Sequence, residues 1–222
     1  MMDATARSRG EKIVGLPPDD VIVAALRAGD EAMFATLLDT WSRGMLRVAR
    51  TYVSTSHSAE EVVQDTWLAV IGGIDGFEGR SSLKTWVYRI LVNTARRRGE
   101  RESRTVPWSS AFEPGDGRSA APAKDADDTL PGVWKAYAET WSAPEGEVLV
   151  SEIRDQIWAA LAALPLRQRS VIVLRDVEGC TSEEVCEILD ISPANQRVLL
   201  HRARVAVRER LKGYFETARR SV

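Results

Sequence analysis

The chain has 222 residues, enough for one or two domains with sizeable cores, and its composition is that of a globular protein. Its 30 Lys and Arg residues nearly balance 32 Asp and Glu residues, so total charge cannot drive binding to DNA and any such function depends on where the charges lie. The apolar stretch Val21–Leu26 is too short to span a bilayer and no signal sequence is present, which predicts a cytoplasmic protein without membrane insertion.

Cysteine and histidine spacing gives no indication of a metal or disulfide site. Cys180 and Cys186 are the only cysteines, and His57 and His201 do not stand at ligand-like spacing from them. We therefore expect two small core residues, with no metal and no cofactor.

Nearly every structured stretch has apolar residues three and four apart, which predicts an all-α fold. A flexible leader is expected over residues 1–18. Asp30 is then the expected N-cap of a helix over 31–53. Its inward stripe consists of Phe34, Leu37, Leu38, Trp41, Met45 and Val48.

Two further helices are expected in the amino-terminal half. Ser58 and Glu61 have the spacing of a capping box that opens a helix over 59–74, followed by a glycine-containing loop. Ser82 is the expected cap of a helix over 83–101, whose apolar stripe is Leu83, Val87, Ile90, Leu91 and Ala95. Its other side carries Arg89, Asn93, Arg96 and Arg97. One face of this helix is expected to pack, and the other is strongly basic.

Residues 104–146 are rich in Pro, Gly and acidic residues, which predicts a long acidic interdomain linker. Trp108, Trp134, Tyr137 and Trp141 are unusual for a disordered segment. Two explanations remain open: the aromatic residues dock onto a domain, or the segment covers a basic surface.

A second helical block follows over 147–222 and contains a helix-turn-helix pattern. Thr181 and Glu184 form a capping-box pattern, a turn is expected at Asp190-Ile191, and Ser192 caps a new helix with Pro193 at its first position. The last helix carries Arg197, His201, Arg204 and Arg208 on one face. Its apolar face carries Leu200, Ala203, Val207 and Leu211.

This arginine stripe has two interpretations, a solvated helix face or a DNA-binding surface. Few acids intersperse it, which favours DNA. In that case the helix start, Pro193 to Arg197, approaches base edges in the major groove, while arginines further along hold phosphates.

A second basic surface lies between Gly79 and Arg104. Its basic residues stand beside Trp86 and Tyr88 and follow the loop GIDGFEGRSS, a combination that suits unpaired nucleic acid, where an unstacked base needs a pocket or platform. For Trp86 the alternative is a simple core position.

Three segments together resemble the bacterial extracytoplasmic-function sigma factors, promoter-specificity subunits of RNA polymerase. AEEVVQDTWLAVI resembles the family's core-polymerase-binding segment, and FEGRSSLKTWVYRILVNTARRR its promoter-melting and minus-ten-reading segment. LPLRQRSVIVLRDVEGCTSEEVCEILDISPANQRVLLHRARVAVRERL resembles the minus-thirty-five-reading domain. The resemblance implies a region 2 domain over 19–103 and a region 4 helix-turn-helix domain over 147–222.

The resemblance also implies partners and site residues, with no reaction catalysed by the chain itself. The implied partners are core RNA polymerase, through its clamp helices and flap, promoter DNA in double-stranded and locally melted form, and an anti-sigma factor. The implied polymerase-binding residues are Glu61, Gln64, Asp65 and Leu68.

The loop 75–82 matches the element that captures a flipped-out base. The implied minus-ten residues are Phe77, Arg80, Ser81, Lys84, Trp86, Tyr88, Arg89, Asn93, Arg96 and Arg97. The implied minus-thirty-five residues are Thr181, Ser192, Pro193, Asn195, Gln196, Arg197, His201, Arg202 and Arg204.

Some residues depart from the family pattern. Asp190 stands where the turn usually has glycine, although aspartate tolerates a left-handed backbone. Gln196 occupies a usually apolar position, and Val198 and Leu199 stand where Ser and Arg are common. These differences predict that the DNA sequence read by the last helix is atypical.

Two other classes of function fit the sequence less well. A helix-turn-helix regulator that acts without entering polymerase leaves the amino-terminal block unexplained. An enzymatic function has no support in the sequence, because there is no His/Asp/Ser set for nucleophilic catalysis and no glycine-rich P-loop. A nuclease would group Glu60, Glu61 and Asp65 around a metal, but an exposed docking face explains these acids better.

Overall fold

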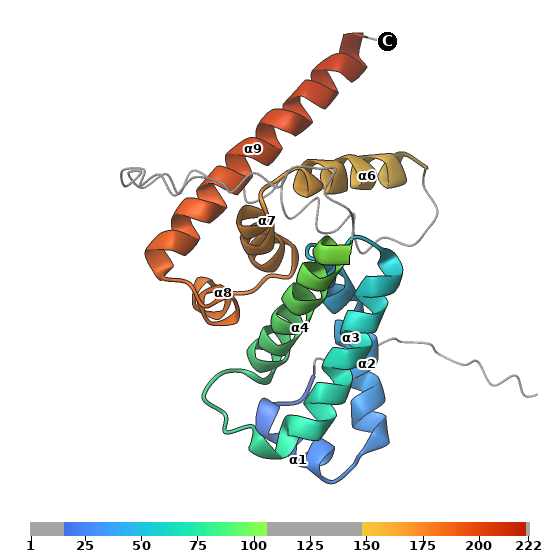
Figure 1. Cartoon of the computed structure of the whole chain (residues 1–222), viewed down its shortest axis with the longest axis vertical. Coiled ribbons are helices and arrows are strands. Elements are labelled where there is room, and N and C mark those ends of the chain that lie inside the picture. The colour runs from blue at the N-terminus through green and yellow to red at the C-terminus, as the bar shows by residue number, and fades with distance from the viewer. Residues whose placement is uncertain (1–15, 106–147, 221–222) are drawn as a thin grey trace, which may run out of the picture.

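Helices make up all the regular structure in the computed structural model, which describes the backbone of residues 16–105 and 148–220 and the side chains of 16–104 and 155–212. Within these residues the prediction of an all-α fold is confirmed (Figure 1). The leader through residue 15 and the linker from residue 106 to 147 lie outside the described residues. None of the described helices is both long enough and apolar enough to cross a membrane.

The amino-terminal unit consists of α1 (Asp19–Arg27), α2 (Glu31–Ala49), α3 (Ser56–Gly73), the short 3-10 helix η1 (Ile74–Gly76) and α4 (Leu83–Thr105). Packing of α2, α3 and α4 against one another encloses its core. The predicted stripe of α2 faces inward, with four positions buried and two partly buried. The buried residues are Leu37, Trp41, Met45 and Val48; Phe34 and Leu38 are partly buried.

The helix caps test the predicted starts. Asp30 caps α2, where its carboxylate accepts hydrogen bonds from the amides of residues 32 and 33 at 3.0 Å each. Ser82 caps α4 by accepting the Thr85 amide at 3.1 Å. The capping box predicted at Ser58 is wrong: α3 begins three residues earlier than predicted, at Ser56, and Thr55 is its N-cap. Thr and Ser both cap helices well, and here the hydroxyl on the extended backbone is that of Thr55.

The carboxy-terminal unit consists of α6 (Val148–Ala162), α7 (Leu166–Ile172), the π-helical segment η2 (Val173–Val177), α8 (Ser182–Leu189) and α9 (Pro193–Arg220). The four predicted apolar positions of α9, Leu200, Ala203, Val207 and Leu211, are buried. This unit contacts the amino-terminal one directly, with α8 against α4 and η2 against α2.

Candidate nucleic-acid interfaces

The helix-turn-helix has the geometry that its sequence predicts. Thr181 and Glu184 form a complete capping box at the start of α8. Asp190 ends the helix in the left-handed region, with φ 55° and ψ 56°, where glycine or a short polar residue is favoured. Ser192 then caps α9 by accepting the Asn195 amide at 3.2 Å. These caps fix the short turn that joins α8 to α9.

The amino-terminal part of α9 presents a polar surface to solvent. Five of the predicted minus-thirty-five residues on this helix are exposed: Pro193, Asn195, Arg197, His201 and Arg202. Ser192 and Thr181 are also exposed, but their hydroxyls serve as helix caps. Donors and acceptors near a helix start are suited to reading base edges in the major groove.

Two predicted contacts on α9 are contradicted by the packing. Gln196 is only 1% exposed and lies in the core, where its Nε2 finds no hydrogen-bond partner among the described residues. Arg204 forms a two-pronged ion pair with Asp176, at 2.7 and 2.9 Å. The Asp176 side chain is 5% exposed and the Arg204 side chain 24% exposed, so the ion pair is largely covered by the protein. Gln196 is therefore absent from the exposed face of α9, and Arg204 is engaged within the protein.

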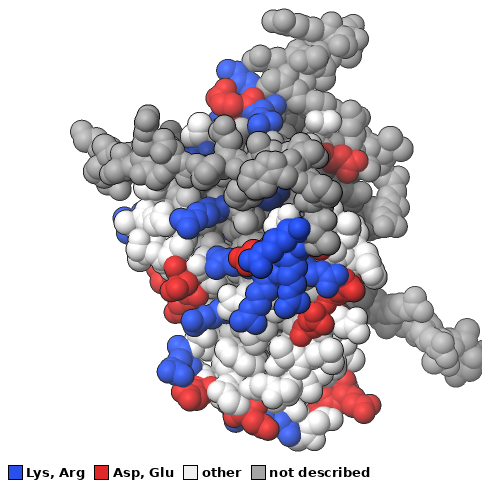
Figure 2. Space-filling model, in the orientation of Figure 1, with Lys and Arg blue, Asp and Glu red and all other residues white. Residues whose placement is uncertain are grey.

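The second basic surface lies on α4. Arg89, Asn93, Arg96 and Arg97 are exposed on the side opposite its buried stripe. Figure 2 shows Lys and Arg side chains gathered over α4 in the middle of this face of the molecule. The prediction that one side of this helix packs while the other is basic is confirmed.

The loop before α4 packs through its aromatic residue. The Phe77 ring lies 5.3 Å from the Trp86 ring, measured between centroids, and both side chains are half-buried. Gly79 adopts φ +70°, a conformation that favours glycine. Arg80 is exposed and pairs with Glu78 at 3.0 Å, while Ser81 is half-buried. Trp86 thus contributes to packing and keeps part of its surface accessible.

Tyr88 was expected on the basic surface of α4, but it is buried instead. It is 1% exposed, and its hydroxyl donates a hydrogen bond to Glu178 at 3.2 Å. Burial, together with the neighbouring Glu178 carboxylate, raises the pKa of Tyr88 far above its ordinary value. The side chain is covered because the carboxy-terminal unit lies over this part of α4.

Glu178 is the centre of the contact between the two units. Its carboxylate is 5% exposed and accepts hydrogen bonds from Arg47 of α2 at 2.7 and 3.3 Å. Lys84 donates to the Glu178 backbone carbonyl at 3.2 Å. An added Cβ on Gly44 would come within 2.3 Å of the carboxylate, so the glycine leaves room for it. Lys84 is thereby engaged between the units as well.

Glu184 forms the second polar contact between the units. One carboxylate oxygen accepts the Thr181 amide of its own capping box at 2.7 Å. The other lies 3.3 Å from the hydroxyls of Ser82 and Thr85 at the start of α4. Partial burial raises the pKa of Glu184, but the hydrogen bonds from Thr181, Thr85 and Ser82 outweigh it and lower the pKa overall. Sequence reasoning missed both contacts, because each joins residues about 100 positions apart.

The predicted polymerase-binding face lies on α3 beside α2. Gln64, Asp65 and Leu68 are exposed, and Leu68 is 61% exposed, unusually high for so large an apolar side chain. A groove of about 400 Å³ runs along this face. Its apolar lining includes Phe34, Leu38, Leu46, Val63, Leu68 and Ile71. Such an exposed apolar groove is typical of a protein-binding surface.

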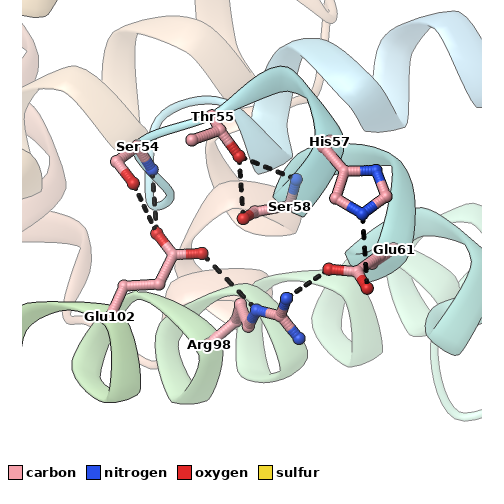
Figure 3. A network of polar contacts seen from close by, with 7 residues as sticks. All are labelled: Ser54, Thr55, His57, Ser58, Glu61, Arg98 and Glu102. Atoms are coloured by element: carbon pink, nitrogen blue, oxygen red, sulfur yellow. Dashed lines mark hydrogen bonds and ion pairs between the residues drawn. The ribbon is translucent and has the colours of Figure 1, made fainter. Parts of the chain in front are cut away.

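Glu61 differs from the other three residues of this set because it is paired within the protein. Arg98 of α4 forms an ion pair with its carboxylate, and His57 lies 3.7 Å from it (Figure 3). The same Arg98 contacts Glu102 at 3.4 Å. Glu61 therefore links α3 to α4.

Glu102 ties the end of α4 to the loop that precedes α3. Its carboxylate accepts the Ser54 amide at 3.0 Å and the Ser54 hydroxyl at 2.8 Å (Figure 3). Partial burial raises the pKa of Glu102, but hydrogen bonds from Ser58, Ser54 and Arg98 outweigh this effect and lower the pKa to about 2. The charged form of Glu102 thus stabilises the basic end of α4.

Within the part of the chain that the structure describes, the cysteines and other potential ligands do not assemble into a metal site. The described residues contain no group of three or more His, Cys, Asp or Glu side chains that could hold a metal ion. Cys180 is buried, as predicted, and burial raises the pKa of its thiol to about 11. Cys186, also expected in the core, is only half-buried, since the buried residues of α8 are Val185, Ile188 and Leu189.

A helix-turn-helix and a second basic helix define the class of this chain, a helical DNA-binding protein. Residues 37–105 match the family model described as Sigma-70 region 2, and residues 154–207 match that of Sigma-70, region 4. The ECF RNA polymerase sigma-E factor of Haemophilus influenzae is 27% identical over 194 residues, 87% of this chain and 95% of that protein. The sigma-E factor of Escherichia coli K12 is 29% identical over 191 residues, 85% of this chain and 92% of that protein.

Two solved structures have the same fold. CnrH, in complex with the cytosolic domain of CnrY, is similar with a TM-score of 0.57 and 19% identity, over 88% of this chain and 97% of that one. The sigma factor RpoE of Bartonella quintana, in complex with the anti-sigma factor NepR, gives a TM-score of 0.54 and 23% identity, over 81% and 96% of the two chains. This chain belongs to the sigma-70 family and is an RNA polymerase sigma factor of the extracytoplasmic-function type.

Proposed function

We propose that this sigma factor reads the minus-thirty-five element as duplex DNA with the start of α9, and the minus-ten element as an opened strand with α4 and the loop before it. The observation that carries the proposal is the pair of exposed polar helix faces, one in each unit. Asn195, Arg197 and Arg202 are exposed on α9, and Arg89, Asn93 and Arg97 on α4. The chain itself catalyses no reaction in this proposal; it directs core polymerase, which does.

The groove between α2 and α3 is the proposed docking surface for the clamp helices of core polymerase, and the region 4 domain is proposed to contact the flap. Leu68 and Ile71, 61% and 52% exposed, supply apolar contact area at the edge of this groove. Gln64 and Asp65 give the polar rim that protein interfaces commonly have. In this proposal Glu61 acts through Arg98, by holding α3 against α4, and not by direct docking.

An anti-sigma factor is the further proposed partner. CnrH and RpoE, which share the fold, were both solved in complexes, the second with the anti-sigma factor NepR. The proposed site of action is the cytoplasm, where core polymerase works. The proposed domains are region 2 over 19–103 and region 4 over 147–222, joined by the acidic segment 104–146.

Run-off transcription with purified core polymerase on a cognate promoter tests the proposal. Arg197→Ala should change promoter preference, with about 1 to 3 kcal/mol less discrimination at one base pair. Arg208→Ala, further along α9, should weaken binding equally on all promoters and reduce the salt dependence by about one phosphate contact. If both variants change promoter preference to the same extent, Arg197 does not read bases while Arg208 contacts phosphate. If the chain does not bind core polymerase, the proposal itself is contradicted.

A further inference from the structure

Helix α1 contacts both ends of the loop 75–82. Its last residue, Arg27, donates hydrogen bonds to backbone carbonyls where the loop begins. Its first residue, Asp19, accepts a hydrogen bond from the Leu83 amide where the loop ends. The two ends of one short helix thus hold the two ends of the loop.

Arg27 binds three carbonyls in four residues. Its Nε and Nη2 atoms both lie 3.3 Å from the Ile74 carbonyl oxygen, and Nη2 lies 3.2 Å from that of Asp75 and 2.8 Å from that of Phe77. These carbonyls follow the end of α3, where the partial charge of a helix is negative and a cation is favoured. A planar guanidinium can bridge several acceptors at once, which a lysine ammonium at the same place would do less well.

Asp19 acts at the opposite end of the loop. Its Oδ2 atom accepts the Leu83 amide at 2.7 Å. Leu83 is the first residue of α4, where backbone amides have no partner within the helix and a carboxylate is favoured. Asp19 thereby fixes the position at which the loop enters α4.

The helix that carries these two residues is itself anchored. Ile22 and Val23 are 1% and 6% exposed and pack into the amino-terminal core. Between the two anchored ends the loop is open, since Glu78, Gly79 and Arg80 are exposed. The ends of the loop are therefore fixed by α1 while its middle remains accessible.

We propose that Arg27 and Asp19 are positioning residues of the minus-ten site: they hold the loop 75–82 in the shape that receives a flipped-out base. The inference rests on the proposed function, which assigns base capture to this loop. Arg27 acts on the loop and not on DNA, because its guanidinium already binds the loop carbonyls. A preformed pocket offsets part of the free energy of unstacking a base, so loosening it should reduce selectivity for that base.

Holoenzyme, assembled from core polymerase and the full chain, is titrated with fork DNA whose nontemplate minus-ten strand is single-stranded. Each position of the element is made abasic in turn, and the position with the largest loss of affinity marks the captured base. The readout is the ratio of the dissociation constants for abasic and intact DNA at that position. Arg27→Gln should lower this ratio about fivefold or more, Asp19→Ala should lower it less, and Arg27→Lys should restore part of it.

Matched controls separate positioning from general damage. Arg43→Gln, at an exposed position of α2, and Asp20→Ala, beside Asp19 on α1, change the same charges and should keep the wild-type ratio. If Arg27→Gln weakens binding to abasic and intact DNA equally, the residue has only a structural role and the inference is overturned.

Phe77→Ala, a change in the loop itself, separates a failure of the positioning role from a failure of base capture by the loop. If Phe77→Ala lowers the ratio of dissociation constants but Arg27→Gln and Asp19→Ala do not, the positioning role is overturned while the loop remains the base pocket. An unchanged ratio in all three variants would show that the loop captures no base, and would overturn both the assignment of the loop and the inference built on it.

Discussion

Gln196 illustrates how one residue can be assigned to the wrong surface. It stands among residues expected to read DNA, yet it occupies a position that is usually apolar in the family, and it is 1% exposed. Its Nε2 has no hydrogen-bond partner among the described residues. A buried amide donor without a partner costs free energy, because it has exchanged its hydrogen bonds to water for none.

Replacing Gln196 with Leu should therefore stabilise the region 4 unit by about 1 kcal/mol, because the apolar side chain has a similar size and no unsatisfied donor. Chemical unfolding followed by circular dichroism measures the change. Gln64→Leu, at an exposed position of α3, is the control and should alter stability by less than about 0.5 kcal/mol. A variant with altered promoter preference and no gain in stability would show that Gln196 contacts bases after all.

At the scale of an element, α9 combines packing and recognition on different faces. Leu200, Ala203 and Val207 are buried, while Arg197 and Arg208 are exposed. Arg204 has the spacing of the exposed arginines but pairs with Asp176 of η2. An arginine stripe on a helix can thus include a member that stabilises the fold, when a carboxylate of a neighbouring element lies within reach.

Arg204→Ala should destabilise the region 4 unit by about 2 to 4 kcal/mol, because it leaves the Asp176 carboxylate, 5% exposed, without its partner. Thermal unfolding measures this effect. Arg208→Ala, at an exposed position of the same helix, should leave the unfolding midpoint nearly unchanged. If the two variants unfold at the same temperature, the ion pair contributes no stability.

At the scale of the whole molecule, the proposed binding of both promoter elements requires the contact between the two units to open. The two elements named for positions −10 and −35 lie about 25 base pairs apart, which is roughly 85 Å of duplex at a rise of 3.4 Å per base pair. In this structure the start of α4 lies 3.3 Å from Glu184 of the helix-turn-helix. The segment of about 40 residues between α4 and α6 could span up to about 130 Å when extended, so its length allows the units to separate.

Glu178→Gln with Glu184→Gln should weaken this contact and increase the radius of gyration of the free chain, measured by small-angle X-ray scattering. Both changes remove charge while keeping shape, and glutamine still supports the capping box of α8. Glu183→Gln with Glu187→Gln, at exposed positions of the same helix, makes the same change in net charge and should not expand the chain. If both double variants have the radius of the wild type, these carboxylates do not hold the units together.

The sequence by itself determined the helices, the caps at Asp30, Ser82, Thr181 and Ser192, and the helix-turn-helix, because these depend on residues three and four positions apart. It could also have indicated α1, since Pro18 and the acidic Asp19 and Asp20 are typical of a helix start. Only the tertiary structure decided which polar side chains remain exposed. Gln196 became buried in the core, Arg204 paired with Asp176, and Glu61 paired with Arg98. Tyr88 became buried against Glu178, which also binds Arg47, 131 positions earlier in the chain. Local patterns fix the secondary structure, but the burial of a charge or an amide depends on partners that only the folded chain brings together.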